Sequence, residues 1–542
     1  MNMNKILKLK RKLLVFSFVS TALITYGEDV MSKADLIKAA ELDTLIPIRQ
    51  GGVDNRPFWN TYAKQFIYVP SFEFKEISGA KSYRFTVKDR FSVKHSFIAD
   101  SPKALLTPVW TKIPVGPVLV TVTALDANGK KIASAGERTF YRNAPFNDSY
   151  PEKDRPYDEC AKKAYEYMYN FKYIQDLADK APDLSYPLFC YPSKMHSAII
   201  TGMINYAAMV PEKKESAMKI ALGAAKHLMN TAAPAGSPLE YLPRTYENNP
   251  AKASTGGENS IMMIYPAVVG GAMINLYNAT GNRNYLDYAI RIGEQYLKLQ
   301  QPNGSWYLIL NISTGKPAAE NYCMPIGIMS YLEKLSKTTG DNRYSKAAAK
   351  GIPYIRTMLA TFNFEGQFED VEAMTKPFIN LTKHIALDAI LYLASIDPDD
   401  PDVKKYAREM QRFAEDQFIV WEQPGWTWKY HVPGWRTLEG MKSRKWGNYN
   451  WNTPCVLEQY RCYVPVDASS AKLIQYFLFL YDREKNPLDL AKARALGDAV
   501  TRVQQRNGRI PTWFDANRPA EHDWINCCFA TANTMKKLAT YK

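Results

Sequence analysis

Cysteine and histidine are scarce in this chain of 542 residues, which has seven cysteines and six histidines. An odd, scattered set of cysteines does not form a disulfide framework, and no Cys/His cluster has zinc-ligand spacing. Cys455 and Cys462 are expected on one helix, roughly 10 Å apart along its axis, too far to form a disulfide. The sequence therefore predicts no metal site, and most cysteines are expected to be small core residues.

Several catalytic motifs are also missing. The chain has no GxSxG elbow, no phosphate-binding P-loop and no GxGxxG fingerprint, so nucleotide chemistry and α/β-hydrolase chemistry are disfavoured and no cofactor is predicted. No nucleic-acid-binding module is recognised, which disfavours nucleic acid as a partner of an exported chain. Hydrophobic residues make up 46% and charged residues 23%, as in ordinary globular proteins.

The only long apolar run lies at the N-terminus, where Lys5, Lys8, Lys10, Arg11 and Lys12 precede residues 13–24. This layout predicts a signal peptide over residues 1–27, because the run is short for a membrane span. The mature protein is then expected to be exported, periplasmic or secreted, without a membrane segment. Removal of these five basic residues lowers the net charge from +15 to +10. A basic exported protein suits an acidic polysaccharide as partner.

Two kinds of periodicity follow a leader and linker at 28–57. Residues 58–145 alternate with period two, and Asn128-Gly129 is a strong hairpin signal, which predicts a small antiparallel β-sandwich of the fibronectin or immunoglobulin type. From 150 to 542 apolar residues recur at helical spacing. The pattern predicts helices at 154–180, 194–210, 212–232, 258–280, 283–301, 318–339, 342–361, 379–396, 401–420, 453–484, 487–505 and 523–541.

The helical segments repeat. Residues 278–285 (NATGNRNY) resemble residues 337–344 (KTTGDNRY), and residues 300–304 (QQPNG) resemble residues 504–508 (QQRNG). Stacked units of this length bury each other's apolar faces. Twelve helices make six hairpins, which predicts a mainly α fold, an (α/α)6 toroid, with an open solenoid as the alternative.

The paired helices, the QQxNG loops and the preceding β-sandwich resemble the six-hairpin glycosidase superfamily of exported polysaccharide-degrading enzymes. Within it, the chain is most similar to uronic-acid-active groups: the β-glucuronidases of glycoside hydrolase family 154, unsaturated glucuronyl hydrolases and toroidal polysaccharide lyases. The resemblance implies an active cleft lined by the loops that enter the inner helices.

A loop at residues 421–451 holds six of the eleven tryptophans, interleaved with basic residues. Flat aromatic faces stack on sugar rings, and fixed cations attract carboxylates. A loop stapled over the core by its tryptophans is the alternative interpretation. The predicted substrate-binding residues here are Trp428, Lys429, Trp435, Arg436 and Trp451, with Arg244, Tyr246 and Glu258 in an earlier loop.

Glycoside hydrolysis needs one carboxylic acid and a second carboxylate. Glu258 and Glu320 are expected at the starts of inner helices, where the helix dipole stabilises an anion. Glu369 and Asp370 belong to an acidic loop, FEGQFEDVE. The predicted acid and base pair is therefore Glu320 with Glu369 or Asp370. The structural alternatives are that Glu258 and Glu320 only stabilise helix N-termini and that Glu369 and Asp370 belong to a solvated acidic loop.

A lyase instead needs a base and a group that neutralises the uronate, which Tyr430 and His431 beside Arg436 supply. The first prediction is an exported glycoside hydrolase that removes glucuronic acid from a uronic-acid-containing glycan. A polysaccharide lyase on the same fold and a non-catalytic glycan-binding protein are the alternatives. The sequence leaves the linkage and the oligomeric state open.

Overall fold

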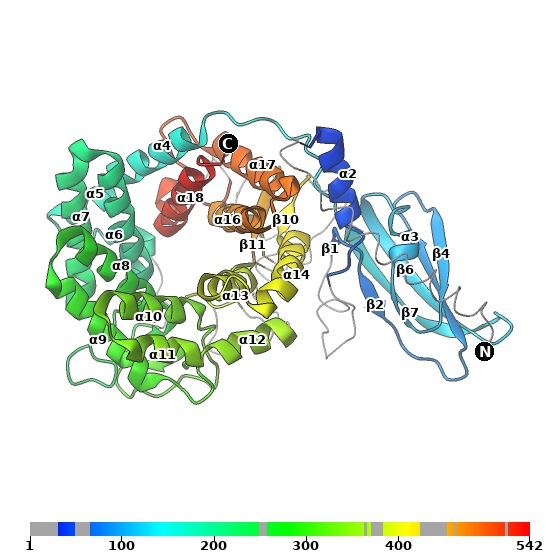
Figure 1. Cartoon of the computed structure of the whole chain (residues 1–542), viewed down its shortest axis with the longest axis horizontal. Coiled ribbons are helices and arrows are strands. Elements are labelled where there is room, and N and C mark those ends of the chain that lie inside the picture. The colour runs from blue at the N-terminus through cyan, green and yellow to red at the C-terminus, as the bar shows by residue number, and fades with distance from the viewer. Residues whose placement is uncertain are drawn as a thin grey trace.

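The computed structural model describes residues 31–48, 65–248, 257–361, 366–369, 383–422, 452–459, 462–514 and 519–541. A ring of helices forms one part of the molecule, and a β-sheet with a short helix beside it forms the other (Figure 1). Over these described stretches, no helix combines the length and the apolar character needed to cross a membrane.

Six helices form the inner wall of the ring. Each packs against the next, and the last also packs against the first, so the ring closes. In order they are α6 (Pro192–Met209), α8 (Ile264–Thr280), α10 (Ile326–Thr339), α13 (Lys383–Ile396), α16 (Asp467–Glu484) and α18 (Ile525–Leu538).

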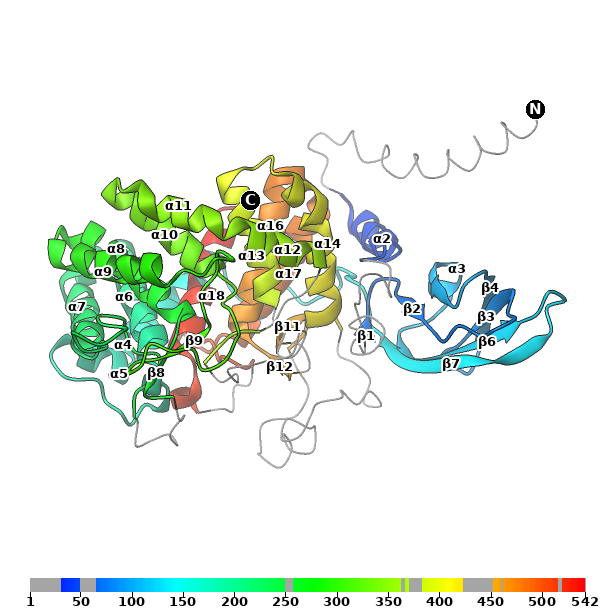
Figure 2. The same ribbon diagram turned by 90° about the horizontal axis from the view of Figure 1, so that it is seen from below.

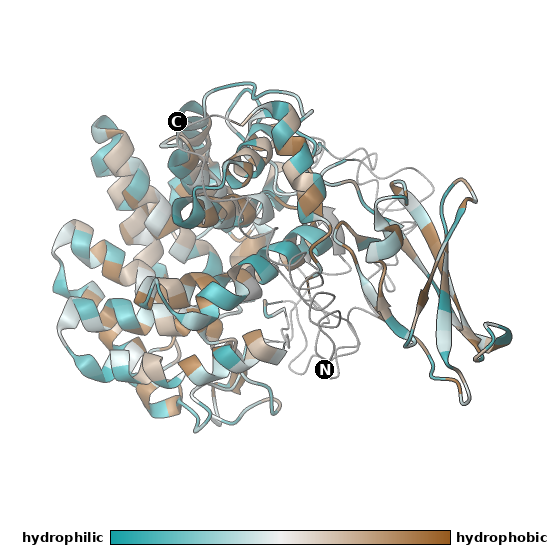
Figure 3. Ribbon diagram, turned by 45° about the vertical axis from the view of Figure 1, so that its right-hand side comes forward, coloured by the Kyte–Doolittle hydropathy of each residue, from teal (hydrophilic) through white to brown (hydrophobic). Residues whose placement is uncertain are grey.

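Outer helices pair with these inner helices. They are α7 (Lys214–Asn230), α9 (Arg283–Leu299), α11 (Asn342–Lys350) continued by α12 (Ile352–Thr361), α14 (Pro401–Phe418), α17 (Pro487–Val503) and α4 (Tyr157–Asn170). The pairs run α6 with α7, then α8 with α9, and so on to α16 with α17, while the final helix α18 pairs with the first, α4. Hydrophilic and hydrophobic residues alternate along the helices (Figure 3), and α9, for example, buries Leu286, Ile292 and Tyr296. Within the described chain these are six helix pairs, five of them hairpins and the sixth formed by the first and last helices of the ring, so the predicted (α/α)6 toroid is confirmed and the open solenoid is excluded.

The TG[N/D] repeats are the turns between inner and outer helices. Gly281 and Gly340 end α8 and α10 with φ of 71° and 77°, a left-handed conformation that glycine adopts without steric cost. The next residues, Asn282 and Asp341, are the N-caps of α9 and α11, and each side chain accepts a backbone N–H two residues later. One short motif therefore stops one helix and starts the next.

The QQxNG repeats join neighbouring outer helices. Gln300 Nε2 donates to the carbonyls of Gly304 (3.0 Å) and Ala347 of α11 (2.8 Å). Gln504 Nε2 donates in the same way to Gly508 (3.0 Å) and to Cys160 of α4 (2.9 Å). Because α4 stands to α17 as α11 stands to α9, the last repeat closes onto the first helix with the contacts used inside the ring.

The sheet domain has a five-stranded sheet in the order β1-β7-β6-β3-β4, with a two-stranded β2-β5 ribbon. Its strands are β1 (Gln65–Phe66), β2 (Ser71–Glu73), β3 (Ser82–Lys88), β4 (Lys94–Ala99), β5 (Lys103–Leu105), β6 (Gly116–Leu125) and β7 (Lys131–Arg142), with α3 (Thr107–Trp110) between β5 and β6. Asn128 and Gly129 lie in the β6–β7 turn, as the sequence predicts. Phe85, Val87, Val120 and Val122 are fully buried and form its core.

Buried polar groups fasten this domain to the ring. Asp416, at the end of α14, accepts backbone N–H bonds from Ile67 (2.5 Å) and Tyr68 (2.9 Å). The neighbouring Glu415 pairs with Lys492 of α17 at 2.8 Å and accepts the Tyr68 hydroxyl at 2.9 Å. Helix α2 (Lys33–Asp43) joins the same network, because Arg412 contacts Asp43 at 3.0 Å.

Three predicted helix starts are wrong. Strands β8 (Ser260–Met262) and β9 (Ile309–Asn311) pair before the inner helices begin, and β11 (Cys455–Gln459) pairs with β10 (Ile419–Val420) and β12 (Cys462–Pro465). Cys455 and Cys462 therefore lie on adjacent strands and not on one helix. Short apolar runs look alike in a strand and in a buried helix, and only the partner strands decide between them.

Candidate active site

The loops that enter the inner helices gather on one side of the ring. Figure 2 shows β8, β9, β11 and β12 together at this edge, below the helices. The first residues of α6 and α8, the residue before α18 and the segment 366–369 contact one another here. We call this face of the ring the mouth.

Glu369 is the central residue of the mouth. Its side chain is 1% exposed, and Oε1 lies 2.5 Å from Nζ of Lys194, in the first turn of α6. The hydroxyl of Tyr265, in the first turn of α8, donates to Oε2. The hydroxyl of Tyr246 donates to the backbone carbonyl of Glu369 at 3.0 Å, which fixes the main chain as well.

Aromatic rings border this ion pair. Lys194 Nζ lies 3.9 Å from the ring centroid of Trp524, a cation–π distance. Trp524 stacks on Tyr191, with centroids 5.7 Å apart and planes 11° from parallel, and Tyr191 meets Tyr246 edge to face at 6.2 Å. Trp524 is only half-buried, so part of it reaches the surface. A carboxylate, an ammonium group and a partly exposed tryptophan thus adjoin one another.

Burial alone would raise the pKa of Glu369, but the adjacent Lys194 ammonium and the Tyr265 hydroxyl outweigh burial and lower this pKa below its ordinary value. Burial and the neighbouring Glu369 raise the pKa of Tyr265 well above its ordinary value. Glu369 is therefore ionised at neutral pH and Tyr265 is protonated. Such a carboxylate can act as a base or nucleophile and cannot serve as a proton donor.

Among the predicted residues, the structure brings Glu369 and Tyr246 together. The next residue, Glu247, anchors this loop to α7, because its carboxylate lies 3.0 Å from Nε2 of His227. The other members of the early loop have structural contacts: Arg244 donates to the carbonyls of Thr231 and Glu258, both at 3.0 Å. Arg244 therefore stabilises the fold of the loop.

Two predicted positions at helix starts are wrong. Glu320 is exposed in the loop after β9, and α10 begins only at Ile326. Glu258 precedes strand β8, and α8 begins at Ile264. Neither carboxylate therefore receives the stabilisation of a helix N-terminus that the sequence suggested.

The other predicted site residues lie outside the described residues. They are Asp370, Trp428, Lys429, Tyr430, His431, Trp435, Arg436 and Trp451, which include most of the tryptophan-rich loop. Trp421, at the start of that loop, is described and is 1% exposed. Its indole donates to Glu415 at 3.0 Å, so this tryptophan belongs to the domain junction.

Sequence reasoning missed Lys194, Tyr265, Tyr191 and Trp524. Each stands at or just before the start of an inner helix, a position that the predicted toroid already marks as the mouth. The periodic pattern could have identified the positions, but not which side chains meet.

Two further buried carboxylates stand near the starts of inner helices. Asp523 accepts from Arg509 Nε at 2.5 Å and from the Thr512 amide at 3.1 Å. Asp467, in the first turn of α16, is fully buried, and burial raises its pKa well above the ordinary value. Asp523 holds Arg509 and the backbone of Thr512, and Asp467 accepts the Thr531 hydroxyl at 2.9 Å, so both carboxylates support the loops. Among the described residues no group of three or more His, Cys, Asp or Glu side chains could hold a metal ion.

Comparisons with known proteins give structural similarity only: no family model and no curated protein matches the sequence. A family 76 glycoside hydrolase from a bovine Bacteroides thetaiotaomicron strain has 12% identity and a TM-score of 0.47, over 86% of this chain and 94% of that one. A cellobiose 2-epimerase from Spirochaeta thermophila has 14% identity and a TM-score of 0.43, over 66% and 88%. A polysaccharide lyase has 10% identity and a TM-score of 0.39, over 88% and 64%. The narrower resemblance to family 154 β-glucuronidases stays a prediction.

Proposed function

We propose that this protein is a carbohydrate-active enzyme, a glycoside hydrolase that binds a uronic-acid-containing glycan at the mouth of the ring. The observation that carries the proposal is the buried, ionised carboxylate of Glu369, paired with Lys194, which in turn lies over the partly exposed Trp524. An aromatic side chain that reaches the surface can contact a sugar, and an ionised carboxylate is one of the two groups that hydrolysis requires.

In this proposal Glu369 is the base or nucleophile. Lys194 and the Tyr265 hydroxyl keep its carboxylate ionised and oriented, and Trp524 forms one wall of the sugar subsite. The complementary proton donor is assigned to Asp370, which follows Glu369 directly in the sequence. The uronic acid is supported by the basic charge of the mature chain and by the cations of the 421–451 loop.

The test is turnover by the mature protein, residues 28–542, on a panel of glycans with and without glucuronic acid. Released uronic acid and ultraviolet absorbance of an unsaturated product are followed together. Free uronate without absorbance is the expected result. Absorbance would instead identify a lyase, and binding without either product would identify a glycan-binding protein.

Glu369→Gln and Glu320→Gln form a matched pair of variants, because both neutralise a carboxylate in a loop that leads to an inner helix. Glu369→Gln is expected to lower kcat at least about a hundredfold, the usual contribution of general acid–base catalysis. Glu320 is exposed, so Glu320→Gln is expected to keep wild-type turnover. Equal activity of the two variants would refute the role of Glu369. Export by the N-terminal 27 residues belongs to the same proposal.

A further inference from the structure

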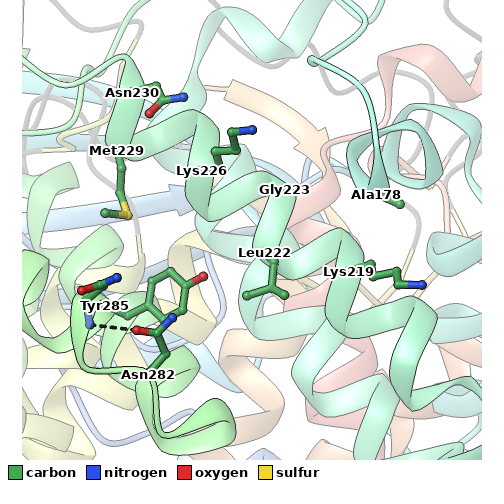
Figure 4. A pocket seen from close by; sticks show the side chains of 10 residues that line it. Ala178, Lys219, Leu222, Gly223, Lys226, Met229, Asn230, Asn282 and Tyr285 are labelled. Carbon is green, nitrogen blue, oxygen red and sulfur yellow. Dashed lines mark hydrogen bonds between the residues drawn. The ribbon is translucent and has the colours of Figure 1, made fainter.

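A groove lies between the outer helices α7 and α9, and none of the residues that line it belongs to the Glu369 site (Figure 4). Its volume is about 420 Å³, enough for a sugar unit. Ten residues line it: Ala178, Lys219, Leu222, Gly223, Lys226, Met229, Asn230, Asn282, Asn284 and Tyr285. Asn282, Asn284 and Tyr285 of the NATGNRNY turn line the groove, in addition to the role of this turn in ending α8 and starting α9.

The end wall of the groove depends on Gly223. A Cβ at this position would lie 1.7 Å from the carbonyl oxygen of Leu177, so only glycine lets the 3₁₀ turn η2 (Asp176–Ala178) cross α7 this closely. Ala178 of that turn faces the groove. The shape of this end of the groove therefore depends on glycine at position 223.

The chemistry of the lining is one-sided. It contains two lysines, three asparagines and a tyrosine, and no acidic residue. Lys226 is exposed, and Lys219 forms an exposed ion pair with Glu215, one turn earlier on α7, at 2.9 Å, a pair of small stabilising energy. Both ammonium groups are thus accessible to an anion.

The floor combines apolar and amide groups. Tyr285, at the start of α9, lies opposite Leu222 and Met229 of α7, and all three side chains are half-buried (Figure 4). Asn230 and Asn282 border this apolar surface. Amides that bond hydroxyl groups, an aromatic ring that stacks on a sugar face and a cation that binds a carboxylate are the three elements for recognising an acidic sugar.

We propose that the groove between α7 and α9 is a second glycan-binding site, which holds an acidic sugar unit of the polymer outside the mouth. The choice of a uronate rests on the proposed function, whereas the binding itself does not. A polymer held here keeps its neighbouring segments near the enzyme, and the effective concentration of substrate at the mouth rises without any new catalytic contact.

The test measures affinity directly, so it does not depend on turnover. The probes are fluorescein-labelled oligogalacturonate, a labelled neutral malto-oligosaccharide and labelled polyglutamate, a polyanion without sugar, with binding followed by fluorescence anisotropy. The groove variant is Lys219→Gln/Lys226→Gln. Its control is Lys163→Gln/Lys346→Gln, which removes the same charge from one lysine paired at i,i+4 and one exposed lysine on α4 and α11.

The groove variant is expected to bind oligogalacturonate about three to ten times more weakly, while the control keeps wild-type affinity. Asn230→Ala is expected to weaken oligogalacturonate binding without weakening polyglutamate binding, because in this proposal the amide bonds sugar hydroxyl groups, which polyglutamate lacks. Equal losses in groove variant and control, or equal effects on all three probes, would reduce the groove to general surface charge and overturn the proposal. If oligogalacturonate binding depends on Lys219, Lys226 and Asn230 but no substrate is turned over, the groove is confirmed as a binding site and the proposed hydrolase activity is refuted.

Discussion

The ion pair of Lys194 and Glu369 allows catalysis to be separated from stability. Removing one partner of a buried pair costs about 3–5 kcal/mol, because the remaining charge stays buried without compensation. The two partners differ in exposure: the Lys194 side chain is 21% exposed and the Glu369 side chain 1%. We therefore expect Lys194→Met to cost about 3–5 kcal/mol, and Glu369→Gln to cost less, about 1–3 kcal/mol.

The double variant Lys194→Met/Glu369→Gln removes both charges. The Tyr265 hydroxyl can still donate to the Gln carbonyl oxygen, and Met fills the space beside Trp524. Its free energy of unfolding is therefore expected to lie within about 1–2 kcal/mol of wild type, since a neutral substitute of similar volume is often tolerated. The two single effects should not add, and the coupling should exceed about 2 kcal/mol.

Urea unfolding of the wild type and the three variants measures these energies, and turnover is measured on the same preparations. A stable but inactive double variant is the expected result and assigns Glu369 a chemical role. A stable double variant with wild-type turnover would refute the reasoning, because Glu369 would then only neutralise Lys194.

Three other predictions concern the framework. Gly223→Ala should lower thermal stability, because the added methyl group collides with the Leu177 carbonyl. Gly271 has open space around it, so Gly271→Ala should raise the free energy of unfolding by about 0.5–1 kcal/mol. Calorimetry compares the two variants, and equal effects would contradict the close crossing of η2 and α7. Burial raises the pKa of Asp416 to about 7, above the unfolded value of 3.8, so its contribution to stability is present below about pH 4 and is lost as pH rises to about 7. Asp416→Asn should therefore flatten the pH dependence of urea unfolding over this range, by about 4 kcal/mol at most, and an unchanged slope would be inconsistent with the raised pKa. Gln504→Ala should cost about 1–3 kcal/mol in urea unfolding, as should Gln300→Ala, since each leaves two carbonyls without their donor; a harmless Gln504→Ala would argue against the ring closure.

The repeating turns could be predicted from the sequence because their conformation depends only on neighbouring residues. Gly281 and Asn282 need only their own backbone conformation and side chain to end one helix and start another, and Gly340 and Asp341 do the same. The helix count and the six-hairpin architecture follow from such signals. Strand β11 was misread as helix because its pairing depends on β10, and the paired residues are 35 and 37 positions apart in the chain.

The candidate site was only partly readable. Glu369 and Tyr246 were named from residue type and loop position, and they meet in the structure. Glu320 satisfied the same criteria and lies exposed. Lys194 and Tyr265 carried no motif, because a lysine or tyrosine in the first turn of a helix is common in any helical protein.

The helical periodicity, the left-handed glycine turns and the hairpin at Gly129 can be predicted without a structure, since each depends on residues close together along the backbone. Which ends of the repeats face one another depends on how the helices pack. The tertiary structure placed Glu369 against Lys194 and Tyr265, residues 175 and 104 positions away, and buried them together. Burial in a shared low-dielectric environment sets the ionisation of that carboxylate, and this property arises only when the ring has closed.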